Sequence, residues 1–203
     1  ANTNQRMIIE FKENLKVRPS KKSSGGLIGG VRRVMGGAIT TKNFRDGSKY
    51  YGELSVAGDR EGQGIIEFGN GDVYFGSWKK DLFDGKGTYI FKSQERYQGN
   101  LVEGSRQGEG EFFYSNGNKY SGSWRNNEKN GRGFLYFANG NVYEGNWKDG
   151  LYSGPGKETF FYGDLFEGDY KYGKKAGNGV FKFECGSDYN GEWKNGRAHG
   201  MGK

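Results

Sequence analysis

A repeat of 23 residues runs through the chain from Tyr50 onward and constrains the fold more than any other feature. Each repeat opens with an aromatic residue, glycine follows two positions later, and Trp, Tyr or Leu stands four positions after the opening. A fixed period of about 20 to 50 residues is the signature of repeat architectures, in which neighbouring units stabilise one another. The openings are Tyr50, Tyr74, Tyr97, Tyr120, Tyr143, Phe166 and Tyr189.

The spacing inside each repeat predicts one β-hairpin. The aromatic, glycine and tryptophan positions share one face of a strand because strand side chains alternate. A glycine pair such as Gly131 and Gly133 then starts a second short strand, and Asn-Gly bends join one hairpin to the next. The predicted fold class is all-β: an elongated single-layer antiparallel meander of six to seven hairpins, with a short helical or irregular N-terminal extension. The second repeat reads Ser93-Gln94-Glu95 where others have a bend glycine, so an altered turn is expected there.

Composition excludes several other classes of protein. The 39 glycines disfavour helices, and the 15 Phe, 14 Tyr and 4 Trp favour strands. One cysteine, Cys185, and one histidine, His199, cannot form an intramolecular disulfide or a structural Cys/His zinc site. Acidic pairs such as Glu109 and Glu111 are expected on a solvated strand face rather than in a catalytic cleft. No enzyme activity, cofactor or metal is therefore expected, and the absence of a long apolar run predicts a soluble, cytoplasmic protein.

Charge and aromatic content both change near residue 50. Residues 1–49 hold eleven Lys and Arg against three Asp and Glu, whereas residues 50–203 hold twenty against twenty-one. This predicts two regions, a basic N-terminal extension (1–49) and the repeat array (50–203). The balanced array is unsuited to tracking phosphates, so no nucleic acid is expected as a partner.

The extension has an amphipathic start and a glycine-rich end. Met7, Ile8, Phe11 and Leu15 share one helical face, and Pro19 stops the helix. Two interpretations stay open for this helix: it caps the first hairpin, or it is a partner-binding arm. Residues 20–24 read as linker, and residues 25–39 read as a linker or as a segment induced by a membrane or partner. Residues 40–50 could form one further hairpin. Contact with an anionic surface is assigned to Lys21, Lys22, Arg32 and Arg33.

Residues 143–150 and 189–200 resemble the MORN repeat, whose pattern is Tyr-x-Gly-x-Trp-x-x-Gly with a later Gly-x-Gly. The resemblance extends over residues 50–203, with departures at Leu54, Leu101 and Tyr170. It implies a scaffold, because MORN proteins form β-hairpin ribbons that bind protein partners along a groove, dimerise or sit near membranes. Many of them belong to cilia, flagella, radial-spoke heads and the cortical cytoskeleton.

Two functions follow as hypotheses. The first is a non-enzymatic scaffold and protein–protein interaction module in a ciliary or flagellar axoneme or another cytoskeletal assembly, with protein partners that include another MORN protein. The second is a peripheral membrane or phosphoinositide-binding adaptor that uses the basic extension on an anionic membrane. The residues assigned to partner binding lie in the middle of the array, and they are Tyr120, Trp124, Tyr143 and Trp147.

Overall fold

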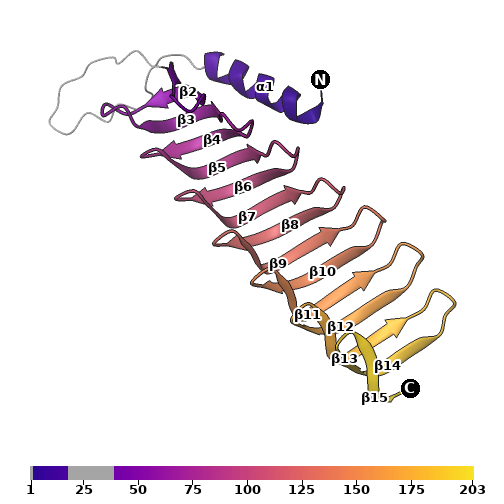
Figure 1. Cartoon of the computed structure of the whole chain (residues 1–203). Helices are drawn as coiled ribbons and strands as arrows, with labels where there is room; N and C mark the ends of the chain where they lie inside the picture. The colour runs from indigo at the N-terminus through magenta and orange to yellow at the C-terminus, as the bar shows by residue number, and fades with distance from the viewer. Residues whose placement is uncertain (1, 18–38) are drawn as a thin grey trace, which may run out of the picture. The chain divides into compact units, whose positions relative to one another are not determined.

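The computed structural model of the chain describes residues 2–17 and 39–203. It divides the chain into two compact units, residues 1–104 (unit 1) and residues 105–203 (unit 2). The described residues form one helix and fifteen strands, and the observed strand pairs are antiparallel (Figure 1). The all-β class and the hairpin meander are therefore confirmed.

Unit 1 consists of the helix and the first six strands, and each strand pairs with the one before it in the sequence. The predicted helix and the extra hairpin at residues 40–50 are both confirmed. The elements are α1 (Thr3–Val17), β1 (Ile39–Asn43), β2 (Lys49–Leu54), β3 (Arg60–Glu67), β4 (Val73–Lys79), β5 (Leu82–Ile90) and β6 (Arg96–Val102).

Unit 2 consists of nine strands that again pair in sequence order. The elements are β7 (Ser105–Phe113), β8 (Lys119–Arg125), β9 (Glu128–Tyr136), β10 (Val142–Lys148), β11 (Leu151–Thr159), β12 (Leu165–Lys171), β13 (Lys174–Lys182), β14 (Asp188–Lys194) and β15 (Arg197–Gly202).

One face of the strands in each unit holds the aromatic core and is called here the ring face. Opposed glycines make room for it: Gly145 is in register with Gly133 and Gly156, and the ring of Tyr143 lies over this glycine row. The Tyr143 hydroxyl donates to the carbonyl of Asn146 at 3.0 Å, so this buried polar group is satisfied. The fully buried openings in the two units are Tyr50, Tyr74, Tyr97, Tyr120, Tyr143 and Phe166.

Tryptophans complete the ring face by bridging successive repeats. The Tyr120 ring lies edge-on between Trp124 and Trp147, 5.1 Å from each ring centroid. The Trp124 indole N–H donates to the carbonyl of Gly110 at 3.0 Å, and Trp147 donates to Gly133 at 3.3 Å. Each repeat therefore completes the packing of its neighbour, as expected for a repeat fold.

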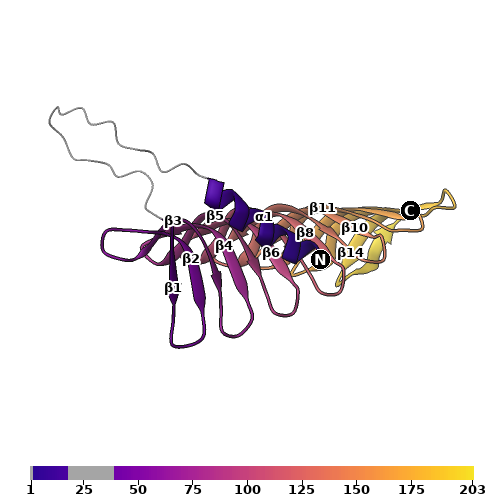
Figure 2. The same cartoon turned by 90° about the horizontal axis from the view of Figure 1, so that it is seen from above.

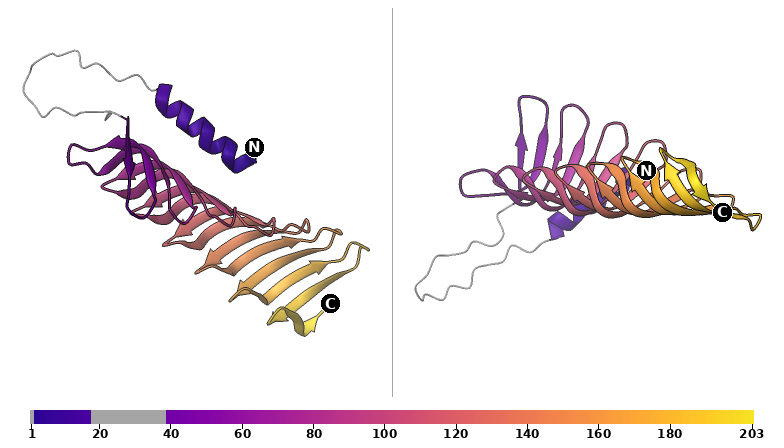
Figure 3. Two further views of the ribbon diagram at one scale, coloured as in Figure 1. Left: turned by 45° about the horizontal axis from the view of Figure 1, so that its top comes forward. Right: turned by 90° about the horizontal axis from the view of Figure 1, so that it is seen from below.

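Wide bends of four residues join the hairpins along one edge of each unit, and Figure 3 shows them at the ends of the strands of unit 2. In each bend the amide of the fourth residue donates to the carbonyl of the first, as Gly140 does to Phe137 at 3.0 Å. The amide of the second residue donates to a side chain just after the preceding bend: Ala138 to Asn118 Oδ1, Phe161 to Asn141 Oδ1 and Glu184 to Asp164 Oδ1, each at 2.9 Å.

The altered turn expected in the second repeat is absent. Gln94 adopts the left-handed conformation (φ +70°) that glycine has in the other bends, and its amide donates to Phe91 at 2.8 Å. Gln94 lies beside the helix, and its side chain and carbonyl accept hydrogen bonds from Asn4 at 3.3 and 3.4 Å.

Helix α1 lies across the strands of unit 1, on the face opposite the rings, which we call the outer face (Figure 2). Met7, Ile8 and Phe11 pack against a cluster formed by Ile65, Phe75 and Ile90 of β3, β4 and β5. The helix therefore docks on the array. It packs on Ile65 of β3, which belongs to the first hairpin, and continues across that face to Phe75 of β4 and Ile90 of β5.

Candidate functional site

The four residues assigned to partner binding lie in the core of unit 2. Tyr120 and Tyr143 have no exposed surface, and Trp124 and Trp147 are 5 % and 4 % exposed. The structure thus gives these rings a packing role on the ring face, and partner binding through them stays a prediction. The residues assigned to anionic-surface contact, Lys21, Lys22, Arg32 and Arg33, lie outside the described residues.

Cations cover part of the ring face of unit 2. The ammonium of Lys129 lies 4.2 Å from the ring centroid of Trp147 and 5.5 Å from that of Tyr120. Burial lowers the pKa of Lys129 to about 8, because the charged form loses hydration. Lys175 lies 4.7 Å from the Phe166 ring and forms an ion pair with Glu158 at 2.9 Å. Through these contacts Lys129 and Lys175 help to pack the ring face.

The outer face of unit 1 binds α1 through both apolar and polar contacts. The Phe11 and Phe75 ring centroids are 5.0 Å apart, and Leu15 is 2 % exposed. Lys12 forms an ion pair with Glu67 of β3. Near the other end of the helix, the Arg96 guanidinium of β6 donates to Asn4 Oδ1 at 3.0 Å. The helix is thus held from β3 to β6.

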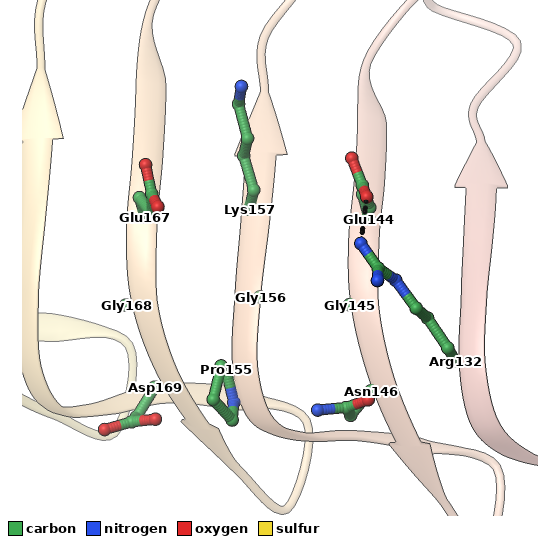
Figure 4. A pocket seen from close by; sticks show the side chains of 10 residues that line it. All are labelled: Arg132, Glu144, Gly145, Asn146, Pro155, Gly156, Lys157, Glu167, Gly168 and Asp169. Atoms are coloured by element: carbon green, nitrogen blue, oxygen red, sulfur yellow. Dashed lines mark hydrogen bonds and ion pairs between the residues drawn. The ribbon is translucent and has the colours of Figure 1, made fainter.

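The corresponding face of unit 2 has a polar trough of about 550 Å³ (Figure 4). Its floor is the backbone of a row of glycines, and polar side chains rise on either side of that row. The Arg132 guanidinium reaches across the floor and pairs with Glu144 at 2.7 Å. One wall is formed by Glu144, Lys157 and Glu167, the floor by Gly145, Gly156 and Gly168, and the other wall by Asn146, Pro155 and Asp169.

A second cavity, of about 270 Å³, lies in unit 1 beneath the C-terminal half of α1. Its lining includes three lysines, Lys12 and Lys16 of the helix and Lys49 of β2, together with Glu67. Lys12 is paired with Glu67, so the mouth of the cavity keeps an excess of positive charge. Tyr51 and Ile65 supply apolar surface.

Across residues 2–17 and 39–203, no group of three or more His, Cys, Asp and Glu side chains is placed to hold a metal ion. In that part of the chain there is also no helix with the length and hydropathy to cross a bilayer. Glu158 forms an ion pair with Lys175 and also accepts a hydrogen bond from the Tyr170 hydroxyl at 3.4 Å. This carboxylate therefore has two partners within the protein.

Sequence reasoning missed the two surfaces of the outer face. For the α1 site a signal existed: Ile65-Ile66 and Tyr74-Phe75 break the alternation of apolar and polar residues, which indicates that both faces of the sheet are covered there. The trough had no such signal. Its polar walls are what any solvated strand face would show, and the concavity at Gly145, Gly156 and Gly168 appears only in three dimensions.

Comparison with solved structures finds distant likeness. The chain is similar to the SAS-4 (dCPAP) TCP domain of Drosophila melanogaster, solved with a proline-rich motif of Ana2 (dSTIL), at 13 % identity and a TM-score of 0.43, covering 82 % of this chain and 99 % of that one. It is also similar to the G-box domain of the microcephaly protein CPAP, at 14 % identity and a TM-score of 0.38, covering 76 % and 93 %. A third similar structure, the TCP10 domain of Danio rerio CPAP, has 16 % identity and a TM-score of 0.26, covering 75 % and 83 %.

No curated protein matches the chain. A family model does match, and it follows the repeat register in which the aromatic openings, glycine rows and tryptophans of the ring face recur. The model is that of the MORN repeat, which matches residues 50–73, 74–96, 97–119, 120–142, 143–164, 166–186 and 189–203. With seven matches over most of its length, the chain belongs to the MORN-repeat family.

Proposed function

We propose that the protein is a non-enzymatic structural scaffold that binds other proteins within a cytoskeletal assembly, with a ciliary or flagellar axoneme as the favoured setting. The coarser part of this function follows from the family: MORN repeats form interaction modules for proteins or membranes, and they are not a known enzyme family. The setting rests on the ciliary and cytoskeletal distribution that the resemblance implies.

The observation that carries the proposal is the docking of α1 on the outer face of unit 1. Phe11 packs on Phe75, and Lys12 pairs with Glu67, so this sheet face already holds a helix through apolar and ionic contacts. The helix fits across the strands for a geometric reason. A helix rises about 5.4 Å per turn, and strands lie about 4.8 Å apart, so a helix laid across the strands presents about one turn to each strand.

Unit 2 presents the same face with different chemistry. Phe75 of unit 1 corresponds in the repeat to Glu144 and Glu167, and Ile65 corresponds to Lys157. An apolar stripe like that of α1 would remove Lys157, Glu167 and the Arg132–Glu144 ion pair from water without new polar contacts, which is unfavourable. A partner for this face must therefore offer charges of opposite sign, foremost Lys or Arg toward Glu144 and Glu167, at strand spacing.

The test compares partner recovery by the full chain and by the variant Glu144→Lys/Glu167→Lys, purified from cells at low and high salt. Loss of the recovered proteins in the variant is the expected result, because like charges then meet across the trough. The control is Lys148→Glu/Lys171→Glu, which reverses two exposed charges at the ends of the same strands, β10 and β12. This control should recover the same partner proteins as the full chain. Equal recovery by all three proteins would rule out the trough as the binding face.

The cytoskeletal setting has its own test. The tagged chain should remain with the detergent-insoluble axoneme or cortex after membranes are extracted, because a scaffold is held by proteins rather than by lipid. Complete release into the detergent fraction would contradict this setting. The Glu144→Lys/Glu167→Lys variant should be released if the trough provides the attachment.

A second candidate function is a peripheral membrane adaptor, and the lysine-lined cavity of unit 1 favours it. Lys16 and Lys49 are among its lining residues, and the extension of residues 1–49 has eight more basic than acidic residues. Such a site suits an anionic lipid headgroup. Vesicles with and without phosphoinositide distinguish the two functions, since lipid binding should fall steeply with salt and with Lys16→Glu/Lys49→Glu.

A further inference from the structure

The bend between β11 and β12 departs from all other wide bends in exposing two large aromatic residues. Phe161 is 78 % exposed and Tyr162 is 62 % exposed. The second and third bend positions elsewhere hold small, polar or charged residues, for example Ala138 and Asn139 in the preceding bend. The sequences of the other bends are Phe44-Arg-Asp-Gly, Phe68-Gly-Asn-Gly, Phe91-Lys-Ser-Gln, Tyr114-Ser-Asn-Gly, Phe137-Ala-Asn-Gly and Phe183-Glu-Cys-Gly.

The two aromatic residues weaken the bend that carries them. In the preceding bend, Asn139 Oδ1 accepts a hydrogen bond from the amide of Asn141 at 3.0 Å, and Asn116 does the same for Asn118. Tyr162 has no side-chain oxygen within reach of that position, because its hydroxyl lies at the far end of the ring. Local turn chemistry therefore favours Asn over Tyr162, and hydration favours a polar residue over Phe161.

The bend is nevertheless held firmly in place. The Phe161 amide donates to Asn141 Oδ1 at 2.9 Å, and Asp164 Oδ1 accepts from the amide of Glu184 in the next bend at 2.9 Å. Phe161 also packs over Gly140, where an added Cβ would come within 2.8 Å of its ring. The Tyr162 ring stacks beside Phe160, with centroids 5.8 Å apart and planes inclined by 25°. Exposed aromatic rings on a fixed base lose little entropy on binding.

The surroundings of the pair are apolar and acidic. Phe183, at the start of the next bend, is 44 % exposed and lies 4.7 Å from the Phe181 ring. The side chain of Glu184 lies against Gly163, the last residue of the Phe161 bend, and brings a negative charge to the neighbourhood of the aromatic pair. Asp164 adds a second negative charge, and the nearby Lys182 is opposite Asp188 in the strand register.

We propose that Phe161 and Tyr162 anchor a protein-docking site, and that the partner offers an apolar pocket rimmed by Lys or Arg. Large aromatic side chains at the centre of an interface dominate binding, and the adjacent Glu184 and Asp164 select a basic rim. The site rests on the proposed function of the chain as a protein-interaction module. It is separate from the trough, because the bend lies at the edge of the sheet and none of its residues lines the trough.

The test uses a bend-swap variant, Phe161→Ala/Tyr162→Asn, which reproduces the bend at residues 137–140. It should be at least as stable as the parent in thermal unfolding, because the Asn restores the missing turn contact. The probe is a displayed library of random peptides, selected on the full chain. Selected peptides should combine apolar residues with Lys or Arg, and their affinity for the bend-swap variant should fall at least about tenfold.

Two further measurements sharpen the result. Cys185, the only cysteine in the chain, is exposed in the bend next to the aromatic pair, so a bound peptide should slow its alkylation by iodoacetamide in the parent but not in the bend-swap variant. The control variant Tyr172→Asn removes an aromatic residue that is 77 % exposed on the opposite edge of unit 2. It should leave both affinity and alkylation unchanged.

Each alternative outcome overturns the proposal. The first is that the selection yields acidic peptides or no peptides, and the second is that the selected peptides bind the bend-swap variant as tightly as the parent. The third is that anionic vesicles bind through Phe161 and Tyr162, and the fourth is that the chain dimerises through these two residues. The proposed function is tested separately. If the bend-swap variant still recovers its cellular partners while Glu144→Lys/Glu167→Lys does not, the docking site fails and the scaffold function stands.

Discussion

The ring of Tyr143 fills the space where a side chain on Gly156 would begin. A Cβ at Gly156 would lie 2.7 Å from the Tyr143 hydroxyl oxygen and 2.9 Å from Cε2, closer than real Cβ contacts allow. The glycine has no positive φ, so space rather than backbone conformation requires it. Glycine rows and aromatic rings in this fold are thus two halves of one packing arrangement.

Gly156→Ala should therefore destabilise unit 2 by roughly 1–3 kcal/mol, the usual effect of overfilling a core. Urea unfolding monitored by tryptophan fluorescence measures the change. Tyr143→Leu/Gly156→Ala should lose less than the sum of the single changes, because the smaller side chain makes room for the new methyl group. Additive losses would show that the two positions do not compete for space.

Lys129 should make stability depend on pH. Its folded-state pKa of about 8 lies below the value of about 10.4 for an unfolded lysine, so the unfolded chain binds more protons between these values. The unfolding free energy should then rise with pH in that window. The raised pKa values of buried Tyr120 and Tyr143 act in the opposite direction above about pH 10, where unfolded tyrosines ionise.

The measurement is urea unfolding between about pH 7.5 and pH 9.5, below the range in which the tyrosines matter. The parent should gain stability relative to Lys129→Met across this range, because methionine keeps the bulk of the side chain and has no proton to lose. Parallel pH profiles for the two proteins would contradict a buried, unpaired ammonium at this position.

Lys175 occupies the same repeat position as Lys129 but should respond differently. Lys175→Met leaves Glu158, whose side chain is only 18 % exposed, without its ionic partner. We expect a loss of roughly 1–3 kcal/mol in the unfolding free energy. Adding Glu158→Gln should recover much of it, since the remaining buried group is then neutral. If the single and double variants are equally unstable, packing of the lysine stem matters more than the charge pair.

The α1 contact should be separable from the fold of the sheet. Phe11→Ala/Leu15→Ala removes two side chains from the interface, and each buried apolar side chain contributes about 1.5–3 kcal/mol. Amide hydrogen exchange in residues 4–17 should quicken by at least about tenfold, while strands β3 to β5 stay protected. Ile9→Ala, at a position 52 % exposed, serves as the control and should leave exchange unchanged.

Most of the fold could be predicted from the register of the 23-residue repeat. Because strand side chains alternate, the offsets of Tyr120, Gly122 and Trp124 were enough to place them on one face, and the structure confirms that placement. Burial could not be assigned from the pattern alone, because a single-layer sheet leaves one face available. In the structure the glycine rows let the rings of successive repeats cover one another. That is why Tyr120 and Trp124 are core residues in the structure.

Contacts between segments that are distant in the sequence could not be predicted from the repeat pattern. Gln94 takes a glycine's conformation next to Asn4, 90 residues away in sequence, and no local rule links the two. The position of α1 depends on Ile65 and Phe75, whose apolar side chains were visible in the sequence, but the helix could be placed only with their outward direction known. The trough likewise depends on curvature that no residue pattern encodes.

The wide bends support one another in a single direction along the chain. Asn118 holds the bend at Ala138, Asn141 holds the bend at Phe161, and Asp164 holds the bend at Glu184, so each repeat carries the acceptor for the repeat that follows it. Removal or duplication of one 23-residue unit among these repeats preserves the pairing, because positions 118, 141 and 164 all hold Asn or Asp. The array can therefore change length over evolution without leaving a bend unsupported, whereas a break inside a repeat cannot be absorbed in this way.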